Sequence, residues 1–585
     1  MTDSTTSVAA DWQPTVSADS IEPGTMSVWK KDGEVLVICK TDDGEFSALD
    51  NRCPHEGYPL NSGDLKGTAL TCSWHNWKFN VRSGACTLGE EGVRSYPVRV
   101  RDGLVEVDLA QPDPSETWPD LLDSFEVGLR KHQVARSARD GVRLLQAGYR
   151  PEQLLIRVAL YDARHAEYGT THATPVAADG ARFLNRYQGL DAMYAIAPAV
   201  DMCGEANRLR PRRERPAPIG GEDLDSLRAA VEGEEVSRAL GILRGAFDAG
   251  RTRQEIDTWM FAVLSDHFLS FGHPLIYFIK LQELLSVAGD AEAEELYEGL
   301  LFSVCNSTRE DTLPYMKGYK ERFQAFQAAQ GPNWRATREG ASEVTQPLAD
   351  RVRDAALHGS TNEALDSLTQ ALEGGASLEQ IASALVAAAA QRLLRFNLAL
   401  DTNPRVAETW LWASHRLTFA SAVRNAVQRF DHKLAVHFLV QAMGFVHSGR
   451  AMDLPVDEWP TPSAETMDVQ AVLTAVAAQD SERAMAGTLG LLGDSSTRRE
   501  LQEALEDLCL NDPLVRPIVV AHAIKTVVVA FEEFDAALNS VDRAIPILAT
   551  VRMLSSPIQE RRIHDAVYHS IQWVGKGIMP KKLTQ

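Results

Sequence analysis

The sequence has no segment that would carry the chain into or across a membrane. Residues 1–8 contain neither a basic stretch nor an apolar one, so we expect no secretory signal peptide. No run of about 18 apolar residues occurs, because His522 and Lys525 interrupt the most apolar stretch, residues 518–531. Basic residues are also scarce, and 59 lysines and arginines against 80 acidic residues leave a formal charge of −21. These absences exclude bulk affinity for nucleic acid or for an anionic membrane surface.

Cysteine is sparse, and most of the seven cysteines have no spacing that suggests a disulfide. Five are scattered along the chain and are expected to be buried free thiols: Cys39, Cys86, Cys203, Cys305 and Cys509. Free thiols persist in a reducing compartment, so the sequence predicts a cytoplasmic protein.

The chain is too long for a single hydrophobic core, and the spacing of its apolar residues changes once along its length. Residues 12–109 carry short alternating apolar runs with glycine and aspartate turns, which predicts a small all-β domain. Residues 110–118 form a proline-rich linker, and residues 119–575 show the apolar spacings of three and four that are typical of helices. The predicted fold class is therefore multidomain, a small all-β domain followed by a large all-α domain, with a disordered tail at 1–11 and a second tail at 576–585.

Two short Cys-His motifs in the β domain carry the clearest chemical signal. They are Cys53-Pro-His55 and Cys72-Ser-Trp-His75. Two thiolates and two imidazoles suit a [2Fe–2S] cluster in which the cysteines hold one iron and the histidines hold the other. A zinc site is the alternative, but zinc ligands usually come as separate Cys-x2-4-Cys and His-x3-5-His pairs. The motifs predict a centre that moves single electrons.

The residues around these motifs resemble Rieske ferredoxins and the Rieske domains of oxygenases. The resemblance covers residues 12–109 and includes apolar strands at 35–39 and 105–109. It implies four cluster ligands, Cys53, His55, Cys72 and His75.

The loops also indicate a low reduction potential. High-potential members of the Rieske family carry a second cysteine in each loop and place serine and tyrosine hydroxyls near the cluster. In this chain Glu56 follows the first histidine, and Trp77 and Phe79 occupy the positions of those hydroxyl residues. Because hydrogen bonds to the cluster sulfurs raise the potential, their absence predicts a value on the order of −150 mV.

Proline-rich breaks divide the helical region into four blocks, at about 119–208, 223–328, 348–450 and 465–575. Each block contains an Ala-Leu-x2-Leu helix, then a second amphipathic helix, and later a histidine that is expected to open a third helix. Those histidines are His172, His273, His415 and His522. The pattern predicts a degenerate internal repeat.

A histidine at the same place in each repeat would approach its counterparts if the blocks pack with pseudosymmetry. Two blocks add a further histidine, so the candidate ligands of a second metal are His165, His172, His267, His273, His415 and His522. Imidazole together with carboxylate suits non-haem iron with open positions for O2. The alternative for each histidine is a structural role, because a histidine can cap a helix or lie hydrogen-bonded in the core.

The usual catalytic domain of Rieske oxygenases is not expected here. Those enzymes hold iron with Asp-x2-His-x4-5-His on a mixed α/β domain, whereas Asp162-x2-His165-x6-His172 has a different spacing in helical surroundings. The phrase Gly-His-Pro-Leu-Ile-Tyr at 272–277 resembles the helical questin-oxidase-like family, which performs Baeyer–Villiger-type oxidation of polyketides. That resemblance favours an oxidative role for the helical region.

The sequence also lacks the glycine-rich motifs of nicotinamide, flavin and nucleotide sites. Electrons are therefore expected from a separate NAD(P)H-dependent reductase or ferredoxin reductase. The first hypothesis is an oxygenase or oxidase that passes electrons through the Rieske cluster to a histidine-rich iron site, where O2 oxidises a small organic substrate. The rival is a Rieske electron carrier whose helical region is a scaffold that binds a partner. Resemblance to Rieske oxygenases also implies a homo-oligomer.

Overall fold

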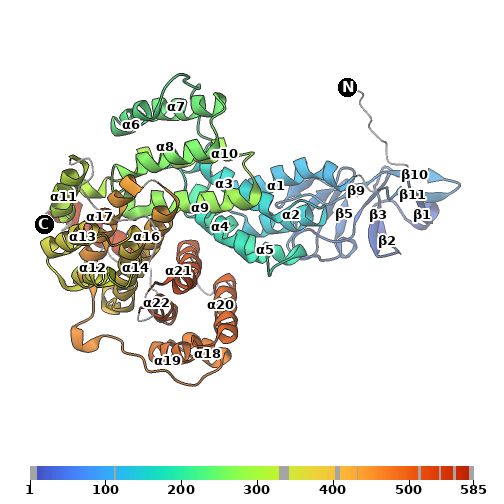
Figure 1. Cartoon of the computed structure of the whole chain (residues 1–585). Helices are drawn as coiled ribbons and strands as arrows, with labels where there is room; N and C mark the ends of the chain where they lie inside the picture. The colour runs from blue at the N-terminus through green and yellow to red at the C-terminus, as the bar shows by residue number, and fades with distance from the viewer. Residues whose placement is uncertain are drawn as a thin grey trace. The chain divides into compact units, whose positions relative to one another are not determined.

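The computed structural model describes residues 10–110, 113–328, 342–401, 403, 409–430, 432–511, 516–538, 542–557 and 562–578. Most of both predicted tails, residues 1–9 and 579–585, lies outside this part of the chain. The chain forms two compact units, one comprising Met1–Gly128 with Gln133–Arg150 and the other comprising Leu129–His132 with Pro151–Gln585. A β domain followed by a large helical region confirms the predicted fold class (Figure 1).

The first unit is built on three small antiparallel sheets. The first sheet has the order β1 (Trp12–Ser17), β11 (Leu104–Asp108), β10 (Val98–Arg101). The second has the order β2 (Thr25–Lys31), β3 (Glu34–Lys40), β4 (Phe46–Asp50), β9 (Ser95–Tyr96). The third has the order β5 (Asp64–Lys66), β6 (Ala69–Thr71), β7 (Lys78–Asn80), β8 (Cys86–Leu88).

Strand β3 has an almost continuously apolar sequence because both of its faces are buried. Leu36 and Ile38 pack into one hydrophobic cluster, and Val37 and Cys39 pack into another. Successive side chains of a strand point to opposite faces, so a strand that is covered on both faces needs apolar residues throughout. The second of these clusters also contains Cys53 and Cys72, which anchors the Cys-His loops in the core.

The first unit also contains α1 (Trp118–Lys131) as far as Gly128, and α2 (Val134–Gln146). Strand gives way to helix after β11, in the region of the predicted linker at 110–118, whereas the compact unit continues to Arg150. The indole N–H of Trp118 donates to the carbonyl of Ala147 at 3.0 Å, which ties the start of α1 to the end of α2. The two helices therefore form a hairpin on the β domain.

The second unit is helical. Its first half contains α3 (Pro151–His165), α4 (Ala173–Phe183), α5 (Ala192–Asn207), α6 (Leu224–Glu232), α7 (Val236–Asp248), α8 (Arg253–Ser265), α9 (His273–Ala288), α10 (Ala293–Cys305) and α11 (Lys317–Ala328). Its second half contains α12 (Gln346–His358), α13 (Thr361–Glu373), α14 (Leu378–Leu394), α15 (Leu398–Asp401), α16 (Trp410–Arg429), α17 (His432–Ser448), α18 (Val469–Ala477), α19 (Ser481–Leu491), α20 (Ser495–Leu510), α21 (Pro517–Ala536), α22 (Ile545–Leu554) and α23 (Arg562–Ser570). Among the described residues, no helix has the length and apolar character that crossing a membrane requires.

Four helices from distant parts of the sequence pack in a ring. Helix α4 packs against α9 and α21, and α16 packs against the same two helices. Each helix of the ring comes from a different predicted block. Helices α9, α16 and α21 each carry one of the four repeated histidines, and His172 is the N-cap of α4. The expectation that each histidine opens its helix is wrong for two of them, because His415 and His522 lie in the second turns of α16 and α21.

The start of α9 explains the Gly-His-Pro phrase. Gly272 has φ +84°, a left-handed conformation that glycine adopts without strain, and it is the N-cap of the helix. A Cβ atom at this position would lie 2.2 Å from the ring of Phe419 on α16. His273 and Pro274 then fill the first two helical positions, where the missing N–H of proline costs no hydrogen bond. Gly272 thus brings the first turn of α9 directly against α16.

Candidate functional site

The two Cys-His motifs form the tips of neighbouring loops in the first unit. One loop follows β4 and the other joins β6 to β7. Each loop is closed by a backbone hydrogen bond from the cysteine N–H, to the carbonyl of Tyr58 in one and of Trp77 in the other, both at 2.8 Å. These bonds set the direction in which the ligands following each cysteine leave the loop.

The donor atoms are segregated by depth. Cys53 and Cys72 are buried, and their thiols interact with each other. The rings of His55 and His75 lie 4.5 Å apart, centroid to centroid, and the His75 side chain is 42% exposed. The buried Nδ1 of His55 has no hydrogen-bond partner among the described residues. Paired thiols beneath paired imidazoles, with an orphaned ring nitrogen, fit a [2Fe–2S] cluster that has cysteines on the inner iron and histidines on the outer one.

A helix outside the predicted β domain reaches this site. The Trp77 ring stacks on His55 with centroids 4.7 Å apart, and the Arg139 guanidinium of α2 lies 6.0 Å from the Trp77 centroid. The buried Glu91 carboxylate bonds to Arg139 and, at 3.0 Å, to Arg143. We call this pairing of Glu91 with Arg139 and Arg143 the Glu91–Arg139 clamp. The sequence alone did not predict it, because the spacing of the three charged residues does not link α2 to the β domain.

Replacing Glu91 with glutamine is expected to raise the reduction potential of the cluster by on the order of tens of millivolts. Reduction adds negative charge to the cluster, so removing the negative charge of Glu91 favours the reduced state, although Arg139 and Arg143 keep Glu90 and Asp140 as partners. A redox titration followed by absorbance or EPR measures the change. Glu90→Gln is the matched control, because Glu90 is more exposed and its charge is better screened. An unchanged or lower potential in Glu91→Gln contradicts the prediction.

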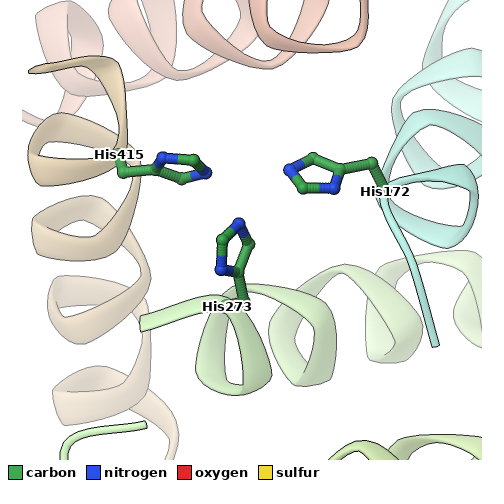
Figure 2. A group of neighbouring side chains, drawn as sticks. All are labelled: His172, His273 and His415. Carbon is green, nitrogen blue, oxygen red and sulfur yellow. The ribbon is translucent and has the colours of Figure 1, made fainter. Parts of the chain in front are cut away.

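In the second unit the four repeated histidines lie together at one end of the helix ring. His172, His273 and His415 converge from α4, α9 and α16 (Figure 2), and their nearest nitrogens all lie within 4.8 Å of one another. The Nε2 atom of His522 is 3.0 Å from the Nε2 atom of His415. The ring centroid of His172 is 4.9 Å from that of His273 and 4.8 Å from that of His522.

Backbone carbonyls determine which nitrogen two of these rings present. A carbonyl only accepts, so Nδ1–H of His273 donates to Ser270 at 2.5 Å and Nδ1–H of His522 donates to Ile518 at 2.6 Å. Each ring therefore directs an Nε2 lone pair into the cluster. Histidines that bind metals almost always donate the other ring N–H in this way. The Nε2 atoms of His172 and His273 and the Nδ1 atom of His415 are buried and have no partner among the described residues.

Burial and neighbouring charge keep the four imidazoles neutral. Desolvation, and then the charge of Lys525, lowers the pKa of His273 to about 3. Desolvation likewise lowers the pKa of His172, His415 and His522 well below the usual range. Three of these rings, those of His172, His273 and His415, each keep one buried nitrogen without a hydrogen-bond partner among the described residues, which is costly unless a cation binds there. The arrangement suits a metal ion bound only by imidazoles, such as iron, zinc or copper.

Acid is expected to release a metal from this cluster only well below the pH at which ordinary histidine sites empty. Protons compete with a metal for imidazole once the pH falls below the pKa of the metal-free ring, and here that pKa is lowered, to about 3 for His273. Metal analysis after dialysis at about pH 5.5 is expected to find the site still loaded. Release with a midpoint near the ordinary histidine pKa of about 6.5 contradicts this prediction.

Two of the six predicted ligands lie elsewhere, and no carboxylate joins the cluster among the described residues. His165 stacks on Tyr161, and its Nδ1 lies 3.0 Å from the carbonyl of Arg210. His267 is held between Asp311 and Glu232 at 3.0 and 2.9 Å. These rings serve hydrogen bonds and ion pairs of the scaffold, so their assignment as ligands is wrong.

Asp162, which precedes His165 in the iron-like motif, has a positioning role. Its carboxylate is fully buried and accepts from the N–H of Thr171 at 2.8 Å, the Thr171 hydroxyl at 2.6 Å and the Asn207 amide at 2.9 Å. The Thr174 hydroxyl donates to it as well, at 3.2 Å. These bonds use the carboxylate fully and hold the turn that carries His172. The expected combination of imidazole with carboxylate is therefore corrected to imidazole alone.

A pocket of about 600 Å³ leads to the cluster, a size suited to a small organic molecule. His172, His273 and Tyr277 form part of its wall. Hydroxyl and amide side chains supply much of the remaining wall, namely Thr170, Thr171, Ser270, Ser303, Asn306, Ser307 and Thr308. Glu167 and Arg210, paired with each other, also line it.

Tyr277 links the pocket to the cluster, because its hydroxyl lies 3.1 Å from Nδ1 of His172. Burial raises the pKa of Tyr277 well above its usual value, so the phenol stays protonated. Tyr277→Phe is expected to weaken metal binding about 10–100-fold, because His172 loses the partner that orients its ring. Equilibrium dialysis against a metal buffer measures the affinity. An affinity equal to that of the unaltered protein contradicts the role.

Comparison with known proteins addresses the first unit. Residues 11–97 match the family described as the Rieske [2Fe-2S] domain, which confirms the resemblance read from the motifs. The chain is 33% identical over 124 residues to the oxidoreductase NdmD of Pseudomonas putida, a match covering 19% of this chain and 21% of that protein. It is 40% identical over 127 residues to the chloroplastic pheophorbide a oxygenase of Oryza sativa subsp. japonica, covering 19% and 22%.

A solved structure, the ferredoxin of Sphingomonas yanoikuyae B1, is 27% identical, with a TM-score of 0.16, and the match covers 17% of this chain and 100% of that chain. The chain spans about a fifth of the length of the two curated relatives above. The N-terminal unit thus contains a Rieske [2Fe-2S] domain. The function of the helical unit must be argued from its own residues.

Proposed function

We propose that this protein is a Rieske-dependent oxidoreductase with a second, histidine-bound metal in its helical unit. A separate NAD(P)H-dependent reductase or ferredoxin reductase supplies electrons. The four ring histidines hold a non-haem iron, and O2 oxidises a small organic substrate in the adjoining pocket. One observation carries the proposal: ring nitrogens of His172, His273 and His415 lie within 4.8 Å of one another, with His522 hydrogen-bonded to His415, beside a pocket of about 600 Å³.

The side chains divide the work. Cys53, Cys72, His55 and His75 bind the [2Fe–2S] cluster, which supplies one-electron transfer when it is bound. His172, His273, His415 and His522 bind the second metal. Tyr277 and the backbone carbonyls of Ser270 and Ile518 orient three of those rings. Two of the histidines also line the pocket, so a substrate held there lies beside the metal ligands.

The rival function is an electron carrier with a helical partner-binding scaffold. Such a carrier needs the two irons of its cluster and has no use for a second metal. The helix ring argues against it, because a scaffold gains nothing from burying three imidazole nitrogens that have no hydrogen-bond partner among the described residues.

Metal stoichiometry tests the proposal. Protein produced with iron is expected to contain more iron per chain than one [2Fe–2S] cluster accounts for, and His273→Ala is expected to lose only the excess. His165→Ala is the matched control, because His165 lies in the same unit outside the cluster, and this variant should keep all its iron. EPR of the reduced protein verifies that the Rieske cluster is intact in both variants. Two irons per chain in the unaltered protein, with no other metal, would establish the carrier instead.

A further inference from the structure

A buried lysine stands beside the histidine cluster without a hydrogen-bond partner. Lys525 is 1% exposed and lies one helical turn after His522 on α21, and its Nζ has no hydrogen-bond partner among the described residues. The other lysine buried in this region, Lys280, is paired with Asp179 at 2.7 Å and Glu283 at 3.1 Å. An unpaired ammonium is costly to bury, so its retention beside the cluster calls for a function.

Lys525 opens onto a small cavity between α9, α16 and α21. The cavity has a volume of about 20 Å³, enough for a single water molecule. Apolar side chains supply most of its exposed wall, and its polar lining residues besides Lys525 are Lys280, Glu283, Thr418, Ser421, Asn425 and Glu532. A water in this cavity would have several hydrogen-bonding partners, so it is a suitable relay between Lys525 and the carboxylates.

Glu532 connects this cavity to a second, open pocket. It lines the small cavity and also a pocket of about 570 Å³ that includes Arg182 and Asp535. Its carboxylate forms an ion pair with Arg182, whose side chain is 42% exposed. Neither of these cavities shares a lining residue with the pocket beside His172 and His273. The histidine cluster therefore has one approach for an organic molecule and a separate polar approach through Lys525.

We propose that Lys525 donates protons to the histidine cluster and that Glu532 resupplies it from solvent across the intervening cavity. The inference rests on the proposed function, because reduction of O2 consumes protons. For insertion of one oxygen atom the balance is R–H + O2 + 2 e⁻ + 2 H⁺ → R–OH + H2O. The O–O bond and a C–H bond break, a C–O bond and three O–H bonds form, and the reductase supplies both electrons. The neutral imidazoles of the cluster hold no proton that they can give.

The charges around Lys525 suit this role. Burial, and to a lesser extent Lys280, lowers the pKa of Lys525 to about 7, although Asp179 opposes the shift. The titratable and charged groups that surround it from the packed helices are Asp179 and Arg182 on α4, His273, Lys280 and Glu283 on α9, His415 on α16, His522 and Glu532 on α21, and His172 before α4. An amine in this environment can both hold and release a proton near neutral pH.

Stopped-flow oxidation of the reduced, metal-loaded protein by O2 tests the proposal without an organic substrate. Lys525→Met is expected to slow oxidation about 10²-fold or more, because the cluster then lacks its nearest proton donor. Glu532→Gln should slow it less, and Asp535→Asn, which changes only the open pocket, should leave it unchanged. A wild-type rate in metal-loaded Lys525→Met overturns the inference.

Two further measurements separate this inference from the proposed function. Metal content is measured first, and an unaltered protein without a second metal defeats the proposed function and the inference with it. If Lys525→Met itself loses the metal, the oxidation rate of Glu532→Gln becomes the deciding measurement. An unchanged rate in Glu532→Gln overturns the relay.

Thermal unfolding of metal-free protein reports the Lys525 ionisation independently of activity. Because folding lowers its pKa, Lys525 protonation favours the unfolded state between about pH 10 and 7. The gain in Tm of Lys525→Met over the unaltered protein should therefore grow as the pH falls through this range and stay constant below it. A gain in Tm that does not change with pH overturns the assignment.

Discussion

Cys72→Ala is expected to remove the Rieske cluster completely while leaving in place the metal that we propose for the helical unit. Cys72 is one of only two thiolates in the paired loops, and it is buried in the core of the first unit, where water cannot take its place. The iron content should fall by the two irons of one cluster, and the EPR signal of the reduced cluster should disappear. Reductase-dependent O2 consumption should fall to the background of the reductase alone.

Cys86→Ala is the control for that result. Cys86 lies in the same β domain and packs against the same hydrophobic cluster, but it is not one of the four ligands. No disulfide joins the seven cysteines, all of which the structure describes, so the substitution breaks no covalent bond. Loss of the cluster in Cys86→Ala, or its retention in Cys72→Ala, contradicts the ligand assignment.

Asp162→Ala is expected to destabilise the helical unit by about 3–5 kcal/mol and to empty the histidine cluster. The substitution leaves the N–H of Thr171 and the amide of Asn207 buried without their acceptor. The turn that carries His172 then has no fixed position, so the metal loses one ligand. Urea unfolding followed by circular dichroism, together with metal analysis, measures both effects.

Thr174→Ala is the corresponding control, because it removes only the longest of the bonds to Asp162, at 3.2 Å. We expect a loss of about 1 kcal/mol and a loaded metal site. Similar destabilisation in Thr174→Ala and Asp162→Ala would mean that the carboxylate does not organise the turn.

The Rieske site could be predicted because its determinants are local. All four predicted ligands lie in two short loops of one small domain, and cysteine and histidine are the residue types that bind such a cluster. The low-potential interpretation also came from positions next to the ligands, Trp77 and Phe79. The Glu91–Arg139 clamp could not be predicted in this way, because it joins a loop of the β domain to α2. The apolar spacing of the sequence places α2 in the predicted all-α domain.

The histidine cluster was predictable only in part. The repeated phrases pointed to His172, His273, His415 and His522, and packing of the four ring helices brings them together. The same reasoning included His165, which ends α3 and faces Arg210 instead. Only six residues lie between His165 and His172, yet the turn between α3 and α4 directs their rings to different places.

The sequence by itself predicted the four ligands of a [2Fe–2S] cluster, and it determined the change from strand to helix and the set of histidines worth considering. Each of these depends on chemistry or periodicity within a short stretch of chain. Tertiary structure alone decided which histidines meet, that no described carboxylate joins them, and that Tyr277 and Lys525 stand beside them. Those outcomes depend on side chains more than a hundred residues apart, and only the packing of the helices, driven by burial of their apolar faces, sets the distances between them.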